Sequence, residues 1–305
     1  MSDANTAATV PGGSLEATEK ALPRARPRPR SHALRLMAPA AFTLLFVVVA
    51  IVGPALVPYN SVEVKVADRL IPPLHQTRSG EVAWLGTDRL GRDMLAQVLS
   101  GARVSLLVGA ATVLLAGTVG TLLGIASGYF SGAFDNVVMR LADVQLAFPS
   151  ILLAILIASV MGQSVTNVII TLAITRWVKF ARVARSAALA AKERDFVQAA
   201  QALGASHTRI LLGHVLPFTM TPLLVIATVE FGLVILAEAG LSFLVLGTPA
   251  AMPSWGLTIS TGRDYLDSAW WISAIPGLAL VFVVVAVGSL GDRLRDLLDP
   301  HMRKL

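Results

Sequence analysis

The sequence has no cysteine and few charged residues, and each shortage excludes a class of protein. Without cysteine among its 305 residues, the chain can form no disulfide, thiolate nucleophile or cysteine-ligated metal site. Its five histidines form no HExxH motif and no close pair, so we expect no metal site. Charged residues make up 14% of the chain, against about 25% in typical soluble domains. Together with the mean hydropathy of +0.70, this low share of charged residues indicates a membrane protein.

The sequence also lacks the machinery for ATP binding and for intramembrane catalysis. It has no GxxxxGK[ST] loop, and none of its five lysines follows a glycine. The energy for any transport must therefore come from a partner or from an ion gradient. A membrane protease would need a pair of intramembrane aspartates or a metal motif, and neither is present. We expect this chain to be non-catalytic and to bind no cofactor itself.

Long apolar runs predict an all-α integral membrane protein. About 20 apolar residues in a helix cross the hydrocarbon core, and six stretches qualify. The fourth is short and is expected to extend past Arg176, whose guanidinium can snorkel to the interface. The predicted spans are Met37–Val57, Val104–Gly128, Val144–Met161, Val165–Val178, Leu216–Glu238 and Trp271–Leu290.

The distribution of lysine and arginine predicts the orientation of these spans. Seventeen of the 25 basic residues lie on one side of the predicted spans and seven on the other, while the acids number ten and seven. Positive residues stay in the cytoplasm, so we expect both termini to be cytoplasmic. The net charge of +6 then reflects topology and does not indicate nucleic-acid binding.

The spans divide the chain into four parts. We read the first as a disordered basic tail, because its PRARPRPR run blocks regular structure; the alternative is a segment attracted to anionic membrane lipid. The parts are a cytoplasmic tail (1–36), a first transmembrane helix with an external loop (37–103), a five-helix core containing a cytoplasmic loop at 191–217 (104–290), and a cytoplasmic C-terminal tail (291–305).

A polar, helix-prone segment, Glu193–Pro217, separates the fourth and fifth spans. Four of its residues recur at positions i, i+3, i+4 and i+7, on one helical face: Phe196, Ala199, Ala200 and Leu203. Such a short amphipathic helix fits a groove on a partner. The alternative is a helix that lies in the lipid headgroup region.

The ends of this helix can also be predicted. Gly204 suits the left-handed position that terminates a helix. Ser206 can cap a second helix over Thr208–Val215. The segment is therefore expected to be two short helices joined by a tight turn.

Two glutamates in the fifth span are candidates for the translocation pathway. Glu230 lies thirteen residues beyond Pro217, about 20 Å along a helix. An acid at that depth is costly and should face protein or water. Glu230 and Glu238 can therefore face a conduit or a partner subunit, or make a plain structural hydrogen bond. They are also the acids on which an ion-driven secondary transporter would depend.

Other patterns make narrower predictions. Gly120, Gly124 and Gly128 lie four apart and predict close approach of another helix, from this chain or from a second subunit. Arg140 and Asp143 are three apart and can pair on a short interfacial helix. The turn-rich stretch Trp84–Asp93 reads as a structural external cap, with direct substrate contact as the alternative.

The segment Glu193–Pro217 resembles the "EAA" loop of ABC-importer permeases, the cytoplasmic element that docks onto the ATPase. Gln198 stands where that pattern has glutamate, and His214 where it has an aliphatic residue. Other motifs strengthen the resemblance: LGTDRLGRD at 85–93, LAEAGLSFL at 236–244, PSWG at 253–256 and GDRLRDLLDP at 291–300. Over residues 35–301 the chain resembles the dipeptide/oligopeptide/nickel ABC importer permeases, specifically their shorter "C" type subunit.

This resemblance implies a type I ABC importer permease with six transmembrane helices and a cytoplasmic coupling-helix loop, in the bacterial inner membrane. The implied partners are a second permease, two ATPase subunits or domains that hold ATP and Mg, and an extracellular solute-binding protein. Di- and oligopeptides are the implied substrates, with nickel or another small solute as the alternative. The implied ATPase-coupling residues are Phe196, Gln198, Ala199, Ala200, Leu203 and Gly204.

Overall fold

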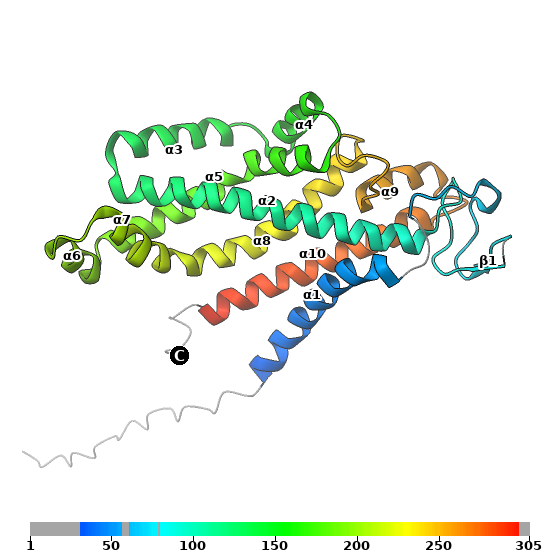
Figure 1. Ribbon diagram of the computed structural model, residues 1–305, viewed down its shortest axis with the longest axis horizontal. Coiled ribbons are helices and arrows are strands. Elements are labelled where there is room, and N and C mark those ends of the chain that lie inside the picture. The colour runs from blue at the N-terminus through cyan, green and yellow to red at the C-terminus, as the bar shows by residue number, and fades with distance from the viewer. Residues whose placement is uncertain (1–30, 57–60, 79, 299–305) are drawn as a thin grey trace, which may run out of the picture.

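A bundle of long helices forms the frame of the protein, in a computed structural model that describes residues 31–56, 61–78 and 80–298 (Figure 1). Most of the predicted basic tail, and residues 299–305, lie outside the described residues. The helices are α1 (Ser31–Leu56), α2 (Met94–Phe130), α3 (Gly132–Leu146), α4 (Ser150–Met161), α5 (Val165–Lys192), α6 (Asp195–Ala202), α7 (His207–Ile210), α8 (Leu216–Phe243), α9 (Trp255–Gly262) and α10 (Trp271–Leu298). Shorter elements are η1 (Val66–Asp68), β1 (His75–Gln76), β2 (Val82–Ala83), η2 (Leu211–Val215) and η3 (Arg263–Tyr265).

The all-α membrane architecture is confirmed, but the count of six spans is not. In the described part of the chain, four helical segments are long and apolar enough to cross a membrane, or five if the bent pair α3 and α4 counts as one. These four are α1, α2, α7 to α8, and α10. Helix α5 has 28 residues, but five of them are basic. Its composition is therefore not that of a simple lipid-facing span.

The third predicted span differs most from the structure. It was expected to run from Val144 to Met161, whereas α4 begins at Ser150 and meets α3 at 90°. Pro149 explains the break, because proline disfavours a helical conformation at the residue before it, Phe148. The 12 residues of α4 reach about 18 Å, which is too short to cross a bilayer alone.

Helices α2 and α5 pack closely and in parallel, so the partner of the glycine stripe lies within this chain. A Cβ atom at Gly120, Gly124 or Gly128 would collide with the backbone of α5 near Trp177, Ala181 and Arg185 respectively. Helix α5 presents its own small residues to this seam, including the fully buried alanines at 184 and 188. The two backbones therefore approach as the spacing predicted.

The motif before α2 folds into a self-bonded turn. The buried carboxylate of Asp88 accepts hydrogen bonds from the backbone N–H groups of Leu90 and Arg92, at 2.8 and 2.9 Å, and from the Arg92 guanidinium at 2.6 Å. Asp93 caps α2 by accepting from the Ala96 N–H at 2.8 Å. The Trp271 indole donates to the Thr87 carbonyl at 3.1 Å and ties the turn to α10. These bonds are those of a structural cap.

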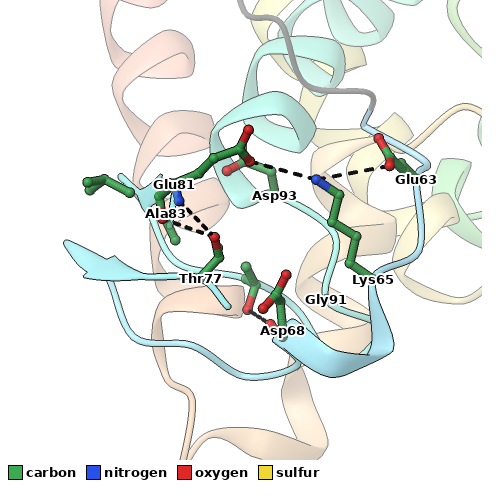
Figure 2. A pocket seen from close by; sticks show the side chains of 10 residues that line it. Glu63, Lys65, Asp68, Thr77, Glu81, Ala83, Gly91 and Asp93 are labelled. Atoms are coloured by element: carbon green, nitrogen blue, oxygen red, sulfur yellow. Dashed lines mark hydrogen bonds and ion pairs between the residues drawn. The ribbon is translucent and has the colours of Figure 1, made fainter. Parts of the chain in front are cut away.

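A small polar cavity lies beside this turn. Figure 2 shows the Lys65 ammonium between the carboxylates of Glu63 and Glu81, at 4.0 and 3.7 Å. Asp68 and Asp93 line the same cavity. The positive charge of Lys65 therefore offsets part of the negative charge of the carboxylates that line the cavity.

The molecule has two distinct ends (Figure 1). Helices α6 and α7 lie at one, which we call the α6 end. The strands β1 and β2, paired antiparallel, lie with α9 toward the other, which we call the hairpin end. The first residue of α1 and the last of α10 both point toward the α6 end. The hairpin end is held by Trp255, which is buried over Gly101 and donates to the Val98 carbonyl at 2.9 Å.

Candidate coupling surface and buried carboxylates

Helix α6 ends in a Schellman motif, as the position of Gly204 predicted. Gly204 has a φ of +76°. Its N–H donates to the Gln201 carbonyl at 3.0 Å, and the Ala205 N–H donates to the Ala200 carbonyl at 3.0 Å. These two bonds satisfy the last carbonyls of the helix and turn the chain sharply.

The cap of the second short helix is also confirmed, although the helix is α-helical only over His207–Ile210 and not to Val215. The Ser206 hydroxyl accepts from the Arg209 N–H at 3.4 Å at the start of α7. Val197 anchors α6 from the opposite side, because it is fully buried in the cluster that includes Ile210 and Val215. Helix α6 is thereby fixed to the body of the protein by the buried Val197 side chain and by the turn at its C-terminal end.

The predicted face of α6 is largely uncovered. Leu203 is 88% exposed and Phe196 44% exposed. Ala199 is exposed and Ala200 is partly buried. Leu203, Ala199 and part of Phe196 therefore form an open face of apolar side chains. Ala200 lies at its edge, where it packs against the cluster around Val197. Gln198 lies on the far side of the helix, where its amide donates to the Glu193 carbonyl at 3.4 Å.

Aromatic contacts connect α6 to α8. The Phe196 ring stacks on His214 with centroids 6.2 Å apart, and lies 6.3 Å from Phe218 near the start of α8. The Arg194 guanidinium lies over the Phe218 ring at 5.8 Å. A displacement of α6 would therefore press on the first turn of α8.

A second connection joins the loop to α2. The Tyr129 hydroxyl and the His207 Nδ1 lie 2.9 Å apart, in a hydrogen bond whose donor depends on the histidine tautomer. Tyr129 is buried near the last residue of α2. Between α7 and α8 the chain forms a π-helix, η2, a rare element often found at functional sites. The sequence predicted a plain helix at this point.

Glu230 is an internal ion-pair centre in this structure. It is 2% exposed, and its carboxylate accepts from Lys179 Nζ at 2.6 Å and from Arg176 Nη1 at 3.2 Å. Arg176 was expected to snorkel to the membrane interface, and that expectation is wrong: its guanidinium turns inward to α8. The structure thus joins α5 to α8 through two basic side chains and one carboxylate.

Glu238 is fully buried, and no cation among the described residues pairs with it. One carboxylate oxygen accepts from the Ser242 hydroxyl at 2.7 Å, while the other has no hydrogen-bond partner in the described part of the chain. The Ser242 oxygen in turn accepts from the Thr248 N–H at 3.2 Å. Ser105 on α2 is also buried without a partner. Since neither Glu230 nor Glu238 reaches a surface in this structure, their place in a translocation pathway stays a prediction.

The ion pairs between α5 and α3 were not predicted from the sequence. Arg185 binds Asp135 in a bidentate pair, at 2.6 Å for each bond. Arg182 binds Asp143 at 2.6 Å. The predicted pair of Arg140 with Asp143 is therefore wrong. Asp143 turns to α5 because α3 lies directly along it.

A signal for this arrangement was present in α5. Its basic residues at 176, 179, 182 and 185 are spaced by three. Each step of three falls about 60° short of a full turn, so the series rotates halfway around the helix. The first two side chains consequently reach α8, and the last two reach α3.

Comparison with known proteins shows the family to which the chain belongs. The bundle of long apolar helices defines it as a multi-pass integral membrane protein. The family model described as "Binding-protein-dependent transport system inner membrane component" matches residues 120–304. The chain belongs to this family and is a permease of the ABC importer type.

Several curated relatives align along most of their length. The Di/tripeptide transport system permease protein DppC of Pseudomonas aeruginosa (strain UCBPP-PA14) is 39% identical over 263 residues, covering 86% of each chain. The Dipeptide transport system permease protein DppC of Alkalihalophilus pseudofirmus is 40% identical, covering 85% of this chain and 83% of the relative. The Glutathione transport system permease protein GsiD of Escherichia coli O6:K15:H31 is 39% identical, covering 88% and 86%.

A solved structure shares the fold. A chain of the MetNI methionine ABC transporter, in inward-facing conformations, aligns with a TM-score of 0.56 and 16% identity. The match covers 68% of this chain and 98% of the MetNI chain. It supports the prediction of a type I importer permease fold.

Proposed function

We propose that this chain is the transmembrane permease subunit of an ATP-driven importer of di- and oligopeptides, and that it forms half of the translocation pathway. The relatives named for dipeptide and di/tripeptide transport support the substrate class. The open face of α6 carries the proposal, because a firmly anchored helix with exposed apolar side chains is suited to dock on a partner. Nickel or another small solute is the alternative cargo.

In this proposal the α6 end lies in the cytoplasm together with both termini. Two ATPase subunits bind ATP and Mg and dock on α6, and a solute-binding protein delivers substrate at the hairpin end. The energy source is ATP hydrolysis by those partners, and this chain does no covalent chemistry. Its task is to convert movement of α6 into movement of the spans.

The contacts around α6 suggest how such movement would travel. Phe196 presses on His214 and Phe218, which leads into α8. His207 holds Tyr129, at the end of α2. Closure of the ATPases would therefore act on two helices that Glu230 and the glycine seam connect to α5. The two end states then differ in how these helices pack, as alternating access requires.

The docking role is tested by Ala200→Asp and Gly204→Val. A carboxylate desolvated in the ATPase groove without a partner would cost a few kcal/mol. Valine at Gly204 would also be forced into a left-handed conformation, costing about 1–2 kcal/mol. We expect each variant to insert in the membrane normally but to release the ATPases or to uncouple ATP hydrolysis. The assays are co-purification with the ATPases and substrate-stimulated hydrolysis in liposomes.

Each variant has a matched control. Ala202→Asp places the same charge on the opposite side of α6. Gly80→Val imposes the same backbone strain at the hairpin end, because Gly80 has a φ of +82° and, like Gly204, open space around it. Both controls should retain coupling. Wild-type ATPase binding and coupled transport in Ala200→Asp and Gly204→Val would refute docking through α6.

Orientation can be tested separately, because the chain has no native cysteine. The probe position in the predicted external loop is Gln76 in β1, which is exposed; the notional alternative, Ser79, lies outside the described residues. An impermeant thiol reagent on intact cells should label Gln76→Cys and should leave Ser206→Cys unlabelled. The opposite pattern would reverse the proposed topology.

Substrate class is tested by uptake. Cells that depend on this importer should accumulate a labelled dipeptide, and unlabelled tripeptide should compete. Accumulation of nickel without dipeptide uptake would favour the alternative cargo.

A further inference from the structure

Helix α3 carries an apolar stripe that nothing in the described chain covers. Phe134, Val137, Leu141 and Val144 are between 45% and 68% exposed. Their spacing of three, four and three residues is that of a seam between two helices that cross at a shallow angle. Residues of α3 alone form the open, nearly flat surface along the same face. The stripe therefore has the geometry of half of a helix–helix contact.

The opposite face of α3 is fixed, so the helix cannot roll to bury the stripe. Asp135 holds Arg185 through two bonds of 2.6 Å, and Val138 and Ala142 are buried against the bundle. Gln145 also donates to the Ile174 carbonyl at 2.8 Å. The stripe points outward because four contacts on the other side require it.

Polar groups beside the stripe argue against lipid as its cover. Asn136 and Arg140 lie on the same open surface as Val137, Leu141 and Val144. Arg140 has no ion-pair partner among the described residues, since Asp143 binds Arg182. Acyl chains on this face would desolvate the guanidinium, which is costly. A carboxylate on a neighbouring helix would neutralise it.

The direction of α3 also argues against a helix that rests on the membrane surface. Such helices lie in the plane of the interface. Helix α3 instead runs alongside α2 and α5, the long helices of the bundle (Figure 1). Helices α1 and α10 pack together on the other side of the bundle and leave the α3 side open (Figure 1).

We propose that α3 is the contact surface for the second permease subunit. In this contact a helix of that subunit lies lengthwise along Phe134, Val137, Leu141 and Val144, and one of its carboxylates faces Arg140. This inference rests on the proposed function, which requires a second permease. It adds the location of the contact and the chemistry of the helix that fits it. The ATPases dock elsewhere, on α6.

Photo-crosslinking in the assembled transporter tests the assignment. Benzoylphenylalanine replaces Leu141 in the full-length chain, and the complex is purified with its ATPases before irradiation. We expect the adduct, identified by mass spectrometry, to join α3 to a chain of the same permease family. The same probe at Val285, an exposed position on α10, should give at least tenfold less of that adduct.

A charge change provides a second readout. Arg140→Glu should reduce the co-purified second permease at least tenfold, because the proposed carboxylate would then face a like charge. Asn136→Gln, on the same surface of α3, should retain the second permease. An adduct of Leu141 with an ATPase or with lipid alone, or no adduct in a complex that retains its partners, would overturn the α3 assignment only. If the wild-type chain purifies without any permease or ATPase partner, the proposed function itself fails.

Discussion

The α6 end and the hairpin end of this protein distribute their side chains in different ways. At the α6 end, Leu203 and Phe196 are exposed although burial would stabilise them. At the hairpin end, Asp88 and Thr87 are buried although water would solvate them, and each is hydrogen-bonded within the loop. The hairpin end also exposes apolar side chains, among them Leu74, Trp84 and Trp270. The difference is that it buries polar side chains and pairs them within the chain.

This difference separates an exposed helix face that is suited to a partner from a cap whose buried polar groups are hydrogen-bonded within the chain. Buried polar groups cost stability unless they are paired, and the hairpin end pairs them within the chain. Exposed apolar side chains at a fixed position do not stabilise the isolated chain. They contribute free energy only when a partner buries them in a complex. Changes at the hairpin end should therefore affect folding first, and changes at the α6 end should affect assembly first.

The largest effect on stability is expected from Trp255→Ala at the hairpin end. It removes a buried indole and its bond to the Val98 carbonyl, at a cost of about 3–5 kcal/mol. The midpoint of thermal unfolding in detergent should fall sharply. Trp270→Ala is the control, because Trp270 is exposed and its loss should shift the midpoint little. Equal shifts would remove the distinction between the cap and the rest of the surface.

The next prediction compares two glutamates on α8. Glu230→Gln leaves Arg176 and Lys179 without their carboxylate, and breaking a buried ion pair costs about 3–5 kcal/mol, less here because Lys179 is partly exposed. Glu238→Gln keeps an oxygen that accepts from Ser242 and keeps polar atoms beside the neighbouring Ser105 and Ser254 hydroxyls, so it should be close to neutral. Thermal unfolding and transport should both be measured. Normal stability in Glu230→Gln would refute its structural role.

A smaller difference is expected between the two ion pairs of α3. Asp135→Asn removes a bidentate, mostly buried pair with Arg185, which we expect to cost about 1–3 kcal/mol. Asp143→Asn removes a pair that is about half exposed on both sides, which is worth at most about 1 kcal/mol. Unfolding midpoints of the two variants in one detergent decide the order. The reverse order would mean that burial does not govern how α3 is held.

The smallest effect concerns Asp93 and depends on pH. Burial raises the pKa of Asp93, although the backbone N–H groups of Ala96 and Leu95 oppose this change. A carboxyl group whose pKa is raised by folding contributes stability below its unfolded pKa of about 3.9 and loses it as the pH rises through the folded pKa. Asp93→Asn should keep the helix cap and remove this loss.

The variant should therefore gain on the wild type as the pH rises above about 4, the unfolded pKa of the carboxyl group. The measurement is the unfolding midpoint of both proteins at each pH. A gain that grows toward low pH would contradict the direction of the pKa change.

Much of the fold and the coupling loop could be predicted from the sequence because local rules govern them. Apolar runs located α1, α2, α8 and α10. The turn at Gly204 and the cap at Ser206 follow from backbone chemistry that a short segment determines by itself. The glycine spacing of α2 predicted a close helix contact, and the structure supplied the partner.

The parts that could not be predicted depend on contacts distant in sequence. The hydropathy of residues 144–161 gives no sign of the 90° bend, whose only local cue is Pro149. Glu230 looked like an isolated acid because its partners lie 51 and 54 residues earlier in the chain. The pairing of Asp143 with Arg182 likewise requires knowing that α3 folds back along α5.

The accessibility of Leu203 tests the central claim most directly. Leu203→Cys introduces a single thiol at the most exposed position of the α6 face, in a chain without other cysteines. Maleimide labelling rates are compared for the permease alone and for its complex with the ATPases, with Gln76→Cys at the hairpin end as the control. If the ATPases dock on α6, Leu203→Cys should be labelled at least tenfold more slowly in the complex, and the labelling of Gln76→Cys should not change. Equal rates for Leu203→Cys with and without the ATPases would contradict docking through α6.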